Sequence, residues 1–144
     1  VHDHDVTHLV IPTSAIRDEG VSYHYLPPSR EVQPNAEGVT MLETILKKHD
    51  LPYVKSKTWT TSAYFRETQD KREQRIAEGC TVVEMEAAAF FAVAKFRSVK
   101  VAQLLYAGDL VVPEGWDHRN WNDRNYIREN LFRIGLETVL EWTV

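Results

Sequence analysis

The chain has 144 residues, of which 43% are hydrophobic, and its formal net charge is −4 at pH 7. This length predicts a single domain over residues 1–144 with a sizeable core, and the polar residues 1–6 are expected to be disordered. A mildly acidic chain gives no electrostatic basis for binding nucleic acid or an anionic membrane, so neither is expected as a partner.

Cys80 is the only cysteine, so an internal disulfide is excluded. That usage is typical of a cytosolic protein, and we predict a cytoplasmic location. Cys80 itself is expected to be a small buried hydrophobe rather than a nucleophile. No apolar run reaches the length of about 18 residues that a membrane-spanning helix needs.

The first half of the chain predicts short strands around one helix. Residues 9–12 form an apolar run of strand length, and residues 23–26 are expected to be extended before a proline-rich loop. Residues 36–48 carry apolar side chains at helical spacing and end in lysines, which the helix dipole favours. Residues 53–61 alternate as a strand does.

The second half begins with a polar helix over residues 67–78, which Gly79 ends. Residues 80–83 predict a buried strand and residues 87–96 a helix, with alanines where another segment comes close. Residues 99–106 are nearly all apolar, as in a strand covered on both faces.

After this run, residues 110–122 are rich in Trp, Pro, Gly, Asp and Asn. Two interpretations stay open: a surface loop fixed by two tryptophans, or a flap from which Arg119 or Asp117 reaches a ligand. Asp123 can cap a last helix with apolar residues at helical spacing.

Two acids are predicted to share one crevice. Residues 80–83, 87–96 and 99–106 predict a β-α-β unit, whose strands are parallel. Glu86 and Asp109 would then both follow carboxyl ends of parallel strands, where ligands bind in open α/β sheets. The alternative is that Glu86 and its neighbour Glu84 are charges that favour a helix N-terminus.

With these residues the chain resembles the nucleoside phosphorylase family, which includes purine nucleoside phosphorylases, uridine phosphorylases and related nucleosidases. The resemblance covers about residues 7–142. Its most specific part is Val83-Glu84-Met85-Glu86-Ala87 with Asp109 placed 23 positions beyond Glu86. Two further matching segments are residues 11–25, similar to the family's central strand pair, and residues 60–68, similar to its base-contacting loop.

The resemblance implies a layered α/β/α domain with a mixed, largely parallel sheet, N-terminally truncated. The family's glycine-rich phosphate loop and a phosphate-binding arginine lie in its N-terminal portion, which this chain does not match. The implied activity is phosphorolysis of a nucleoside to free base and ribose 1-phosphate, with inorganic phosphate as co-substrate and no cofactor or metal. A hydrolytic nucleosidase and a non-catalytic nucleoside-binding or assembly protein are the alternatives. The family also implies a homo-oligomer.

Cleavage of an N-glycosidic bond builds positive charge on the sugar and negative charge on the base. By resemblance, Glu86 accepts hydrogen bonds from the ribose hydroxyls, and Asp109 is the acid that donates to N7 of a purine. The other substrate-binding residues that the resemblance implies are Glu84, Met85, Tyr64 and Arg119. A pyrimidine base stays open, because Gln69 and Lys71 imitate the spacing of a uracil-reading pair.

Overall fold

The computed structural model describes residues 9–112, 115–117 and 125–142. Within this part of the chain, five strands form one sheet, in the order β2-β1-β3-β4, with β5 also paired to β1. The strands are β1 (Leu9–Asp18), β2 (Glu31–Val32), β3 (Tyr53–Thr61), β4 (Cys80–Glu84) and β5 (Leu105–Tyr106). Since β1, β3 and β4 are parallel while β2 and β5 run antiparallel to β1, the predicted α/β class with a mixed, mainly parallel sheet is confirmed.

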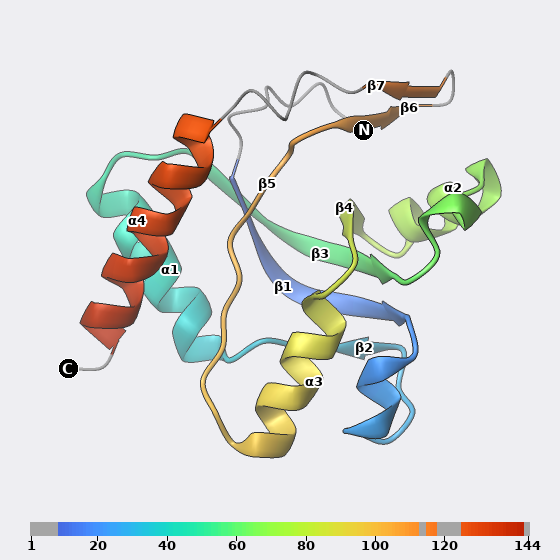
Figure 1. Ribbon diagram of the computed structural model, residues 1–144, viewed down its shortest axis with the longest axis horizontal. Helices are drawn as coiled ribbons and strands as arrows, with labels where there is room; N and C mark the ends of the chain where they lie inside the picture. Colours follow the sequence, from blue (N-terminus) through green and yellow to red (C-terminus); the bar gives the residue numbers. More distant parts are fainter. Residues whose placement is uncertain (1–8, 113–114, 118–124, 143–144) are drawn as a thin grey trace.

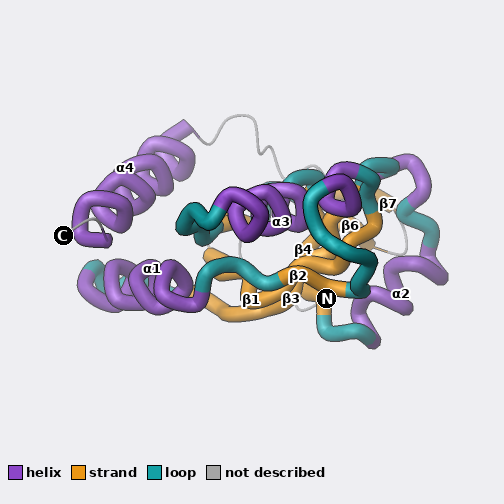
Figure 2. Tube along the Cα trace, turned by 90° about the horizontal axis from the view of Figure 1, so that it is seen from below, coloured by secondary structure: helices purple, strands orange, loops and turns teal. Residues whose placement is uncertain are grey.

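The helices are α1 (Ala36–Lys48), α2 (Gln69–Ala77), α3 (Ala87–Arg97) and α4 (Asn125–Trp142), with the 3₁₀ helices η1 (Val21–His24) and η2 (Tyr64–Arg66). A small hairpin pairs β6 (Leu110–Val112) with β7 (Gly115–Asp117). Figures 1 and 2 show α1 and α4 together at one end of the molecule and α2 at the opposite end. None of the helices described is long and apolar enough to cross a membrane.

Helix α1 forms where its periodicity predicts it. The side chain of Asn35 accepts a hydrogen bond from the backbone N–H of Gly38 at 3.2 Å, which caps the first turn. The apolar side of the helix, including Ile45 and Leu46, is buried in a core shared with the start of β1 and with Ile134 of α4. The ring of Trp142 in α4 closes against Gly38, where a larger residue would not fit.

One extra residue lets β1 serve two cores. The register of β1 on β3 shifts at Thr13, directly after Pro12, which has no N–H to give to a ladder. An extra residue reverses the alternation of the two faces. Leu9 and Ile11 accordingly pack with α1, whereas Ala15 packs with α3.

Helix α3 is brought close to the sheet by its small residues. Ala87, Ala88 and Ala92 are fully buried, as the run of alanines predicts. The side chain of Phe91 fills the space between them, Ala15 and β2. The start of α3, and the residues just before it, are thereby fixed at the end of β4.

Four predicted segments differ from the structure. The strand predicted over residues 9–12 continues to Asp18 as β1. Residues 23–26 are not extended, because η1 and the turn after it occupy them, and the short strand β2 lies in the segment read as loop. The run 99–106 contributes only the two-residue β5, and β5 is antiparallel to β1. The predicted parallel β-α-β unit is therefore wrong: β4 runs parallel to β1 through β3, so β4 and β5 run in opposite directions.

Candidate active site

The carboxyl ends of three parallel strands meet at one edge of the sheet. The register places Asp18 of β1 beside Thr61 of β3, and Thr60 of β3 beside Glu84 of β4. Ligands bind at this kind of edge in open α/β proteins. The Glu84-Met85-Glu86 motif lies directly on it, between the end of β4 and the start of α3.

The carboxylate of Glu84 is committed to holding α3 in place. Its Oε1 accepts hydrogen bonds from the hydroxyls of Thr60 at 2.6 Å and Thr58 at 3.1 Å. Its Oε2 accepts the backbone N–H groups of Glu86 at 2.7 Å and Ala87 at 2.5 Å. A carboxylate at a helix N-terminus is favoured by the unpaired N–H groups and by the helix dipole. Glu84 therefore acts as the anchor of α3.

Glu86 is the N-cap residue of α3, but its side chain makes no capping hydrogen bond. Within the described part of the chain, its carboxylate has no hydrogen bond or ion pair, and the residue is exposed at the edge of the sheet. Met85 beside it is 44% exposed. The two acids of the motif thus differ: the first is used by the fold, and the second is available to a ligand.

The loop 62–68 follows β3 at the same edge. The rings of Tyr64 and Phe65 lie 4.0 Å apart between centroids, and both are exposed rather than part of the core. Glu67, at the end of the loop, is half-buried. Burial and the negative charge of Asp109 raise the pKa of the Glu67 carboxyl, while the nearby Arg72 opposes the shift.

Asp109 does not follow a strand parallel to β4, as the sequence predicts. Because β5 is antiparallel to β1, the chain leaves β5 beside the start of β1, not beside its carboxyl end. Asp109 is exposed in the bend before β6, and its negative charge acts on the carboxyl of Glu67. The structure therefore relates Asp109 to the loop that carries Tyr64, and its pairing with Glu86 stays a prediction.

Other predicted residues are only partly placed. Arg119 lies outside the described residues, as do residues 1–6. Lys71 forms an ion pair with Asp18 at 3.4 Å, and Gln69 donates to Glu73 at 2.9 Å, so both members of the uracil-like pair have protein partners. Cys80 is buried, and burial together with the charge of Glu78 raises the pKa of its thiol to about 11.

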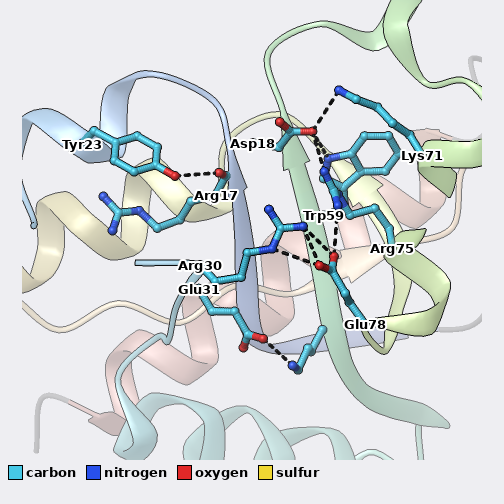
Figure 3. Close-up of polar contacts among 10 residues, drawn as sticks. Arg17, Asp18, Tyr23, Arg30, Glu31, Trp59, Lys71, Arg75 and Glu78 are labelled. Atoms are coloured by element: carbon cyan, nitrogen blue, oxygen red, sulfur yellow. Dashed lines mark hydrogen bonds and ion pairs between the residues drawn. The ribbon is translucent and has the colours of Figure 1, made fainter. Parts of the chain in front are cut away.

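Sequence reasoning missed a polar cluster at the end of β1, which Figure 3 shows. Asp18 Oδ2 accepts hydrogen bonds from Trp59 Nε1 at 3.0 Å and Arg75 Nη2 at 3.1 Å. Arg75 is the only buried residue of α2, and no local pattern in the sequence distinguishes it from the other basic residues of that helix. Its partners are 57 and 16 positions away in the chain, so only the folded sheet brings them together.

The fold and the site define an α/β domain with a mainly parallel sheet and an available carboxylate at its carboxyl edge. The chain belongs to the Phosphorylase superfamily, whose family model matches residues 1–140. A comparison with curated proteins gave no match.

Two solved structures share the fold. AMP nucleosidase from Bacteroides thetaiotaomicron VPI-5482 aligns with a TM-score of 0.63 and 23% identity, over 73% of this chain and 46% of that one. The P. knowlesi homologue of P. falciparum PNP aligns with a TM-score of 0.70 and 20% identity, over 94% of this chain and 54% of that one. The chain thus spans about half of the length of each.

Proposed function

We propose that the chain supplies the sugar- and base-binding side of a site that cleaves a nucleoside by phosphorolysis, giving free base and ribose 1-phosphate. The observation that carries this proposal is the difference between two neighbouring acids. The carboxylate of Glu84 is hydrogen-bonded to the start of α3, whereas the exposed carboxylate of Glu86 makes no capping hydrogen bond. Membership of the Phosphorylase superfamily supports it. The co-substrate is inorganic phosphate, and the reaction needs no cofactor or metal.

Each residue has a defined task in this proposal. Glu86 accepts hydrogen bonds from the ribose hydroxyls and stabilises the positive charge that builds on the sugar. Met85 packs under the sugar as a soft apolar surface. Tyr64 stacks on the base, and Asp109 donates a proton to N7 of a purine as the bond breaks. Arg119 contributes to substrate binding from the segment after β7.

The Glu86 assignment predicts opposite results for two neighbouring variants. Glu86→Gln should weaken nucleoside binding by about tenfold or more, because hydrogen bonds to a charged acceptor are lost. Its stability should change by less than about 0.5 kcal/mol. Glu84→Gln should instead lower the free energy of unfolding by about 2 kcal/mol, since an amide nitrogen cannot accept the N–H bonds of α3. Calorimetric binding and urea unfolding measure the two effects. Equal losses of binding and stability in both variants would contradict the assignment.

Hydrolysis is the second candidate, because AMP nucleosidase shares the fold. A nucleosidase releases base with water, so its rate is independent of phosphate. Assays of base release with and without phosphate separate the two reactions. Binding of a nucleoside with no release under either condition would select the third candidate, a non-catalytic nucleoside-binding protein.

A purine is the proposed base. Lys71 and Gln69, which would read a uracil, are engaged by Asp18 and Glu73. Asp109 as a proton donor has an obvious acceptor at N7 of a purine. Parallel titrations with inosine and uridine test this choice, and tighter binding of uridine would reverse it.

The proposal includes a homo-oligomer. On α4, Phe132 is 72% exposed and Leu136 is 50% exposed, which is apolar surface that association could cover. Sedimentation at micromolar concentration should detect self-association, and Phe132→Glu should weaken it. A monomer at all concentrations would contradict this part.

A further inference from the structure

Helix α2 is attached to the sheet by a polar contact. Arg75 is its only buried residue, and its one large apolar residue, Ile76, is 50% exposed. The guanidinium of Arg75 lies over the ring of Trp59, 5.3 Å from its centroid. A helix normally attaches through an apolar stripe, so the position of α2 depends to an unusual degree on this one side chain.

The carboxylate of Asp18 is the centre of this attachment. Its Oδ2 accepts from Arg75 Nη2 at 3.1 Å, from Trp59 Nε1 at 3.0 Å and from Lys71 Nζ at 3.4 Å (Figure 3). Burial raises the pKa of Asp18, but hydrogen bonds from Arg75 and Trp59 and the charge of Lys71 outweigh it, so the pKa is lowered. Asp18 is therefore ionised at neutral pH and binds two of the cationic residues of α2, Lys71 and Arg75.

A second layer of ion pairs fixes the end of the helix. Arg75 Nη1 donates to Glu78 at 3.1 Å. Glu78 in turn accepts two hydrogen bonds from Arg30 Nη2, at 2.6 and 2.7 Å. Since Arg75 reaches two carboxylates and a ring face at once, its planar guanidinium is used in a way that a lysine could not match.

Asp18 also holds the other end of the loop that α2 follows. Its backbone carbonyl accepts a hydrogen bond from the N–H of Ser62 at 3.4 Å. The loop 62–68 therefore begins at a bond to the Asp18 backbone, and the helix after it is bound by the Asp18 side chain. Tyr64 and Glu67 lie between these two contacts.

We propose that Asp18, through Arg75 and Ser62, positions the loop 62–68 for binding of the base. Asp18 is a positioning residue, because it acts through the loop and does not touch the substrate itself. The inference deepens the proposed function and rests on it. It adds that recognition of the base depends on the carboxylate at the end of β1.

The test compares free base with nucleoside. Asp18→Asn keeps the shape of the side chain but removes the charge that binds α2. If the loop then holds its binding position about one tenth of the time, affinity falls about tenfold. Because the loop contacts the base, the affinities for hypoxanthine and for inosine should fall by the same factor. Glu86→Gln, by contrast, should lower the affinity for inosine and leave the affinity for hypoxanthine unchanged.

The control is Lys55→Met, which removes an exposed ion pair of similar length, 3.1 Å to Glu43, outside this cluster. It should leave both affinities unchanged. Amide hydrogen exchange gives a second measurement. In Asp18→Asn, the amides of residues 62–77 should lose protection, and the amides of the sheet should keep theirs. Should Asp18→Asn fail to fold, Arg75→Lys weakens the same contact while keeping a charge for Asp18.

The outcomes separate the two proposals. If wild type binds both ligands and Asp18→Asn (or Arg75→Lys, in its place) binds them equally well, the positioning role is wrong and the proposed function stands. The positioning role would also be wrong if Asp18→Asn lowered the affinity for inosine but not the affinity for hypoxanthine. If wild type binds neither ligand nor uridine, the proposed function fails, and the positioning role fails with it.

Discussion

Thr60 and Glu84 lie opposite each other in the parallel pair β3–β4, and the Thr60 hydroxyl donates to the Glu84 carboxylate at 2.6 Å. The same hydroxyl accepts the backbone N–H of Ala88 at 3.0 Å. One buried side chain thus joins two strands and the first turn of α3. Thr60, a residue of β3, therefore helps to fix the start of α3 and with it the position of Glu86.

Replacing Thr60 with valine tests this contact, since it keeps the shape and removes the hydroxyl. The N–H of Ala88 is left without its partner, so the free energy of unfolding should fall by about 1–3 kcal/mol. Thr81→Val is the matched control, because its hydroxyl bonds Ser56 at the exposed surface. That change should cost less than about 0.5 kcal/mol. Equal losses in urea unfolding would contradict the prediction.

Ionisation of Glu67 should lower the free energy of unfolding at neutral pH. Its pKa is raised in the folded state by burial and by Asp109, so ionisation of Glu67 opposes folding. The stability it contributes is fully present below its unfolded pKa of about 4.3 and is lost as pH rises through the folded pKa. Glu67→Gln should therefore unfold at a higher temperature than wild type at pH 7, and at the same temperature near pH 3. A variant that is less stable at pH 7 would show that the charge is favoured in the fold.

Gly38 should not tolerate a side chain, although it lies in a helix. Alanine in place of glycine usually stabilises a helix by about 1 kcal/mol. Here a Cβ would clash with the end of the Trp142 ring and would lie 2.8 Å from Cβ of Ala102, so the Trp142 side chain or the segment that carries Ala102 must shift. We expect Gly38→Ala to lower the free energy of unfolding by roughly 1–3 kcal/mol.

Gly135 in α4 provides the matched control for Gly38. A Cβ built on Gly135 meets nothing within 4 Å. Gly135→Ala should therefore stabilise the protein by up to about 1 kcal/mol through helix propensity alone. Thermal unfolding of both variants should give shifts of opposite sign, and shifts of the same sign would show that Trp142 moves aside freely.

Asp109→Asn tests the general acid of the proposed reaction in a form of the protein that turns over purine nucleosides. Asparagine keeps the shape but cannot deliver a proton, so turnover should fall by about 10²–10⁴-fold. Substrate affinity should be nearly unchanged. Intact turnover on purine nucleosides would make the acid assignment wrong and bring the uridine alternative forward.

The sequence predicts elements well where pattern alone decides them. Helix α1 and strand β3 have the predicted bounds, 36–48 and 53–61, because periodicity and local turn residues determine both. The run 99–106 failed for the opposite reason: an apolar composition says nothing about which strand it meets or in which direction. Val99 is in fact 56% exposed.

The candidate site could likewise be predicted only in part. The Glu84-Met85-Glu86 motif could be located from its residues, but the different tasks of its two acids could not. That difference depends on Thr58 and Thr60, more than 20 positions earlier in the chain, which reach Glu84 only when β3 and β4 pair. The Asp18–Arg75 contact joins residues 57 positions apart and has no local signal.

Because of its extra residue, β1 should tolerate substitutions at Thr13 better than it tolerates the deletion of a residue. Many substitutions at Thr13 could keep the bulge, but a deletion there would restore uninterrupted alternation and turn every later residue of the strand to the other face. Ala15 would leave the α3 core, and Asp18 would leave Trp59 and Arg75. A one-codon loss would therefore disturb both helix packing and loop placement, so in descendants of this gene we expect insertions and deletions to be excluded from β1 while side chains at Thr13 vary.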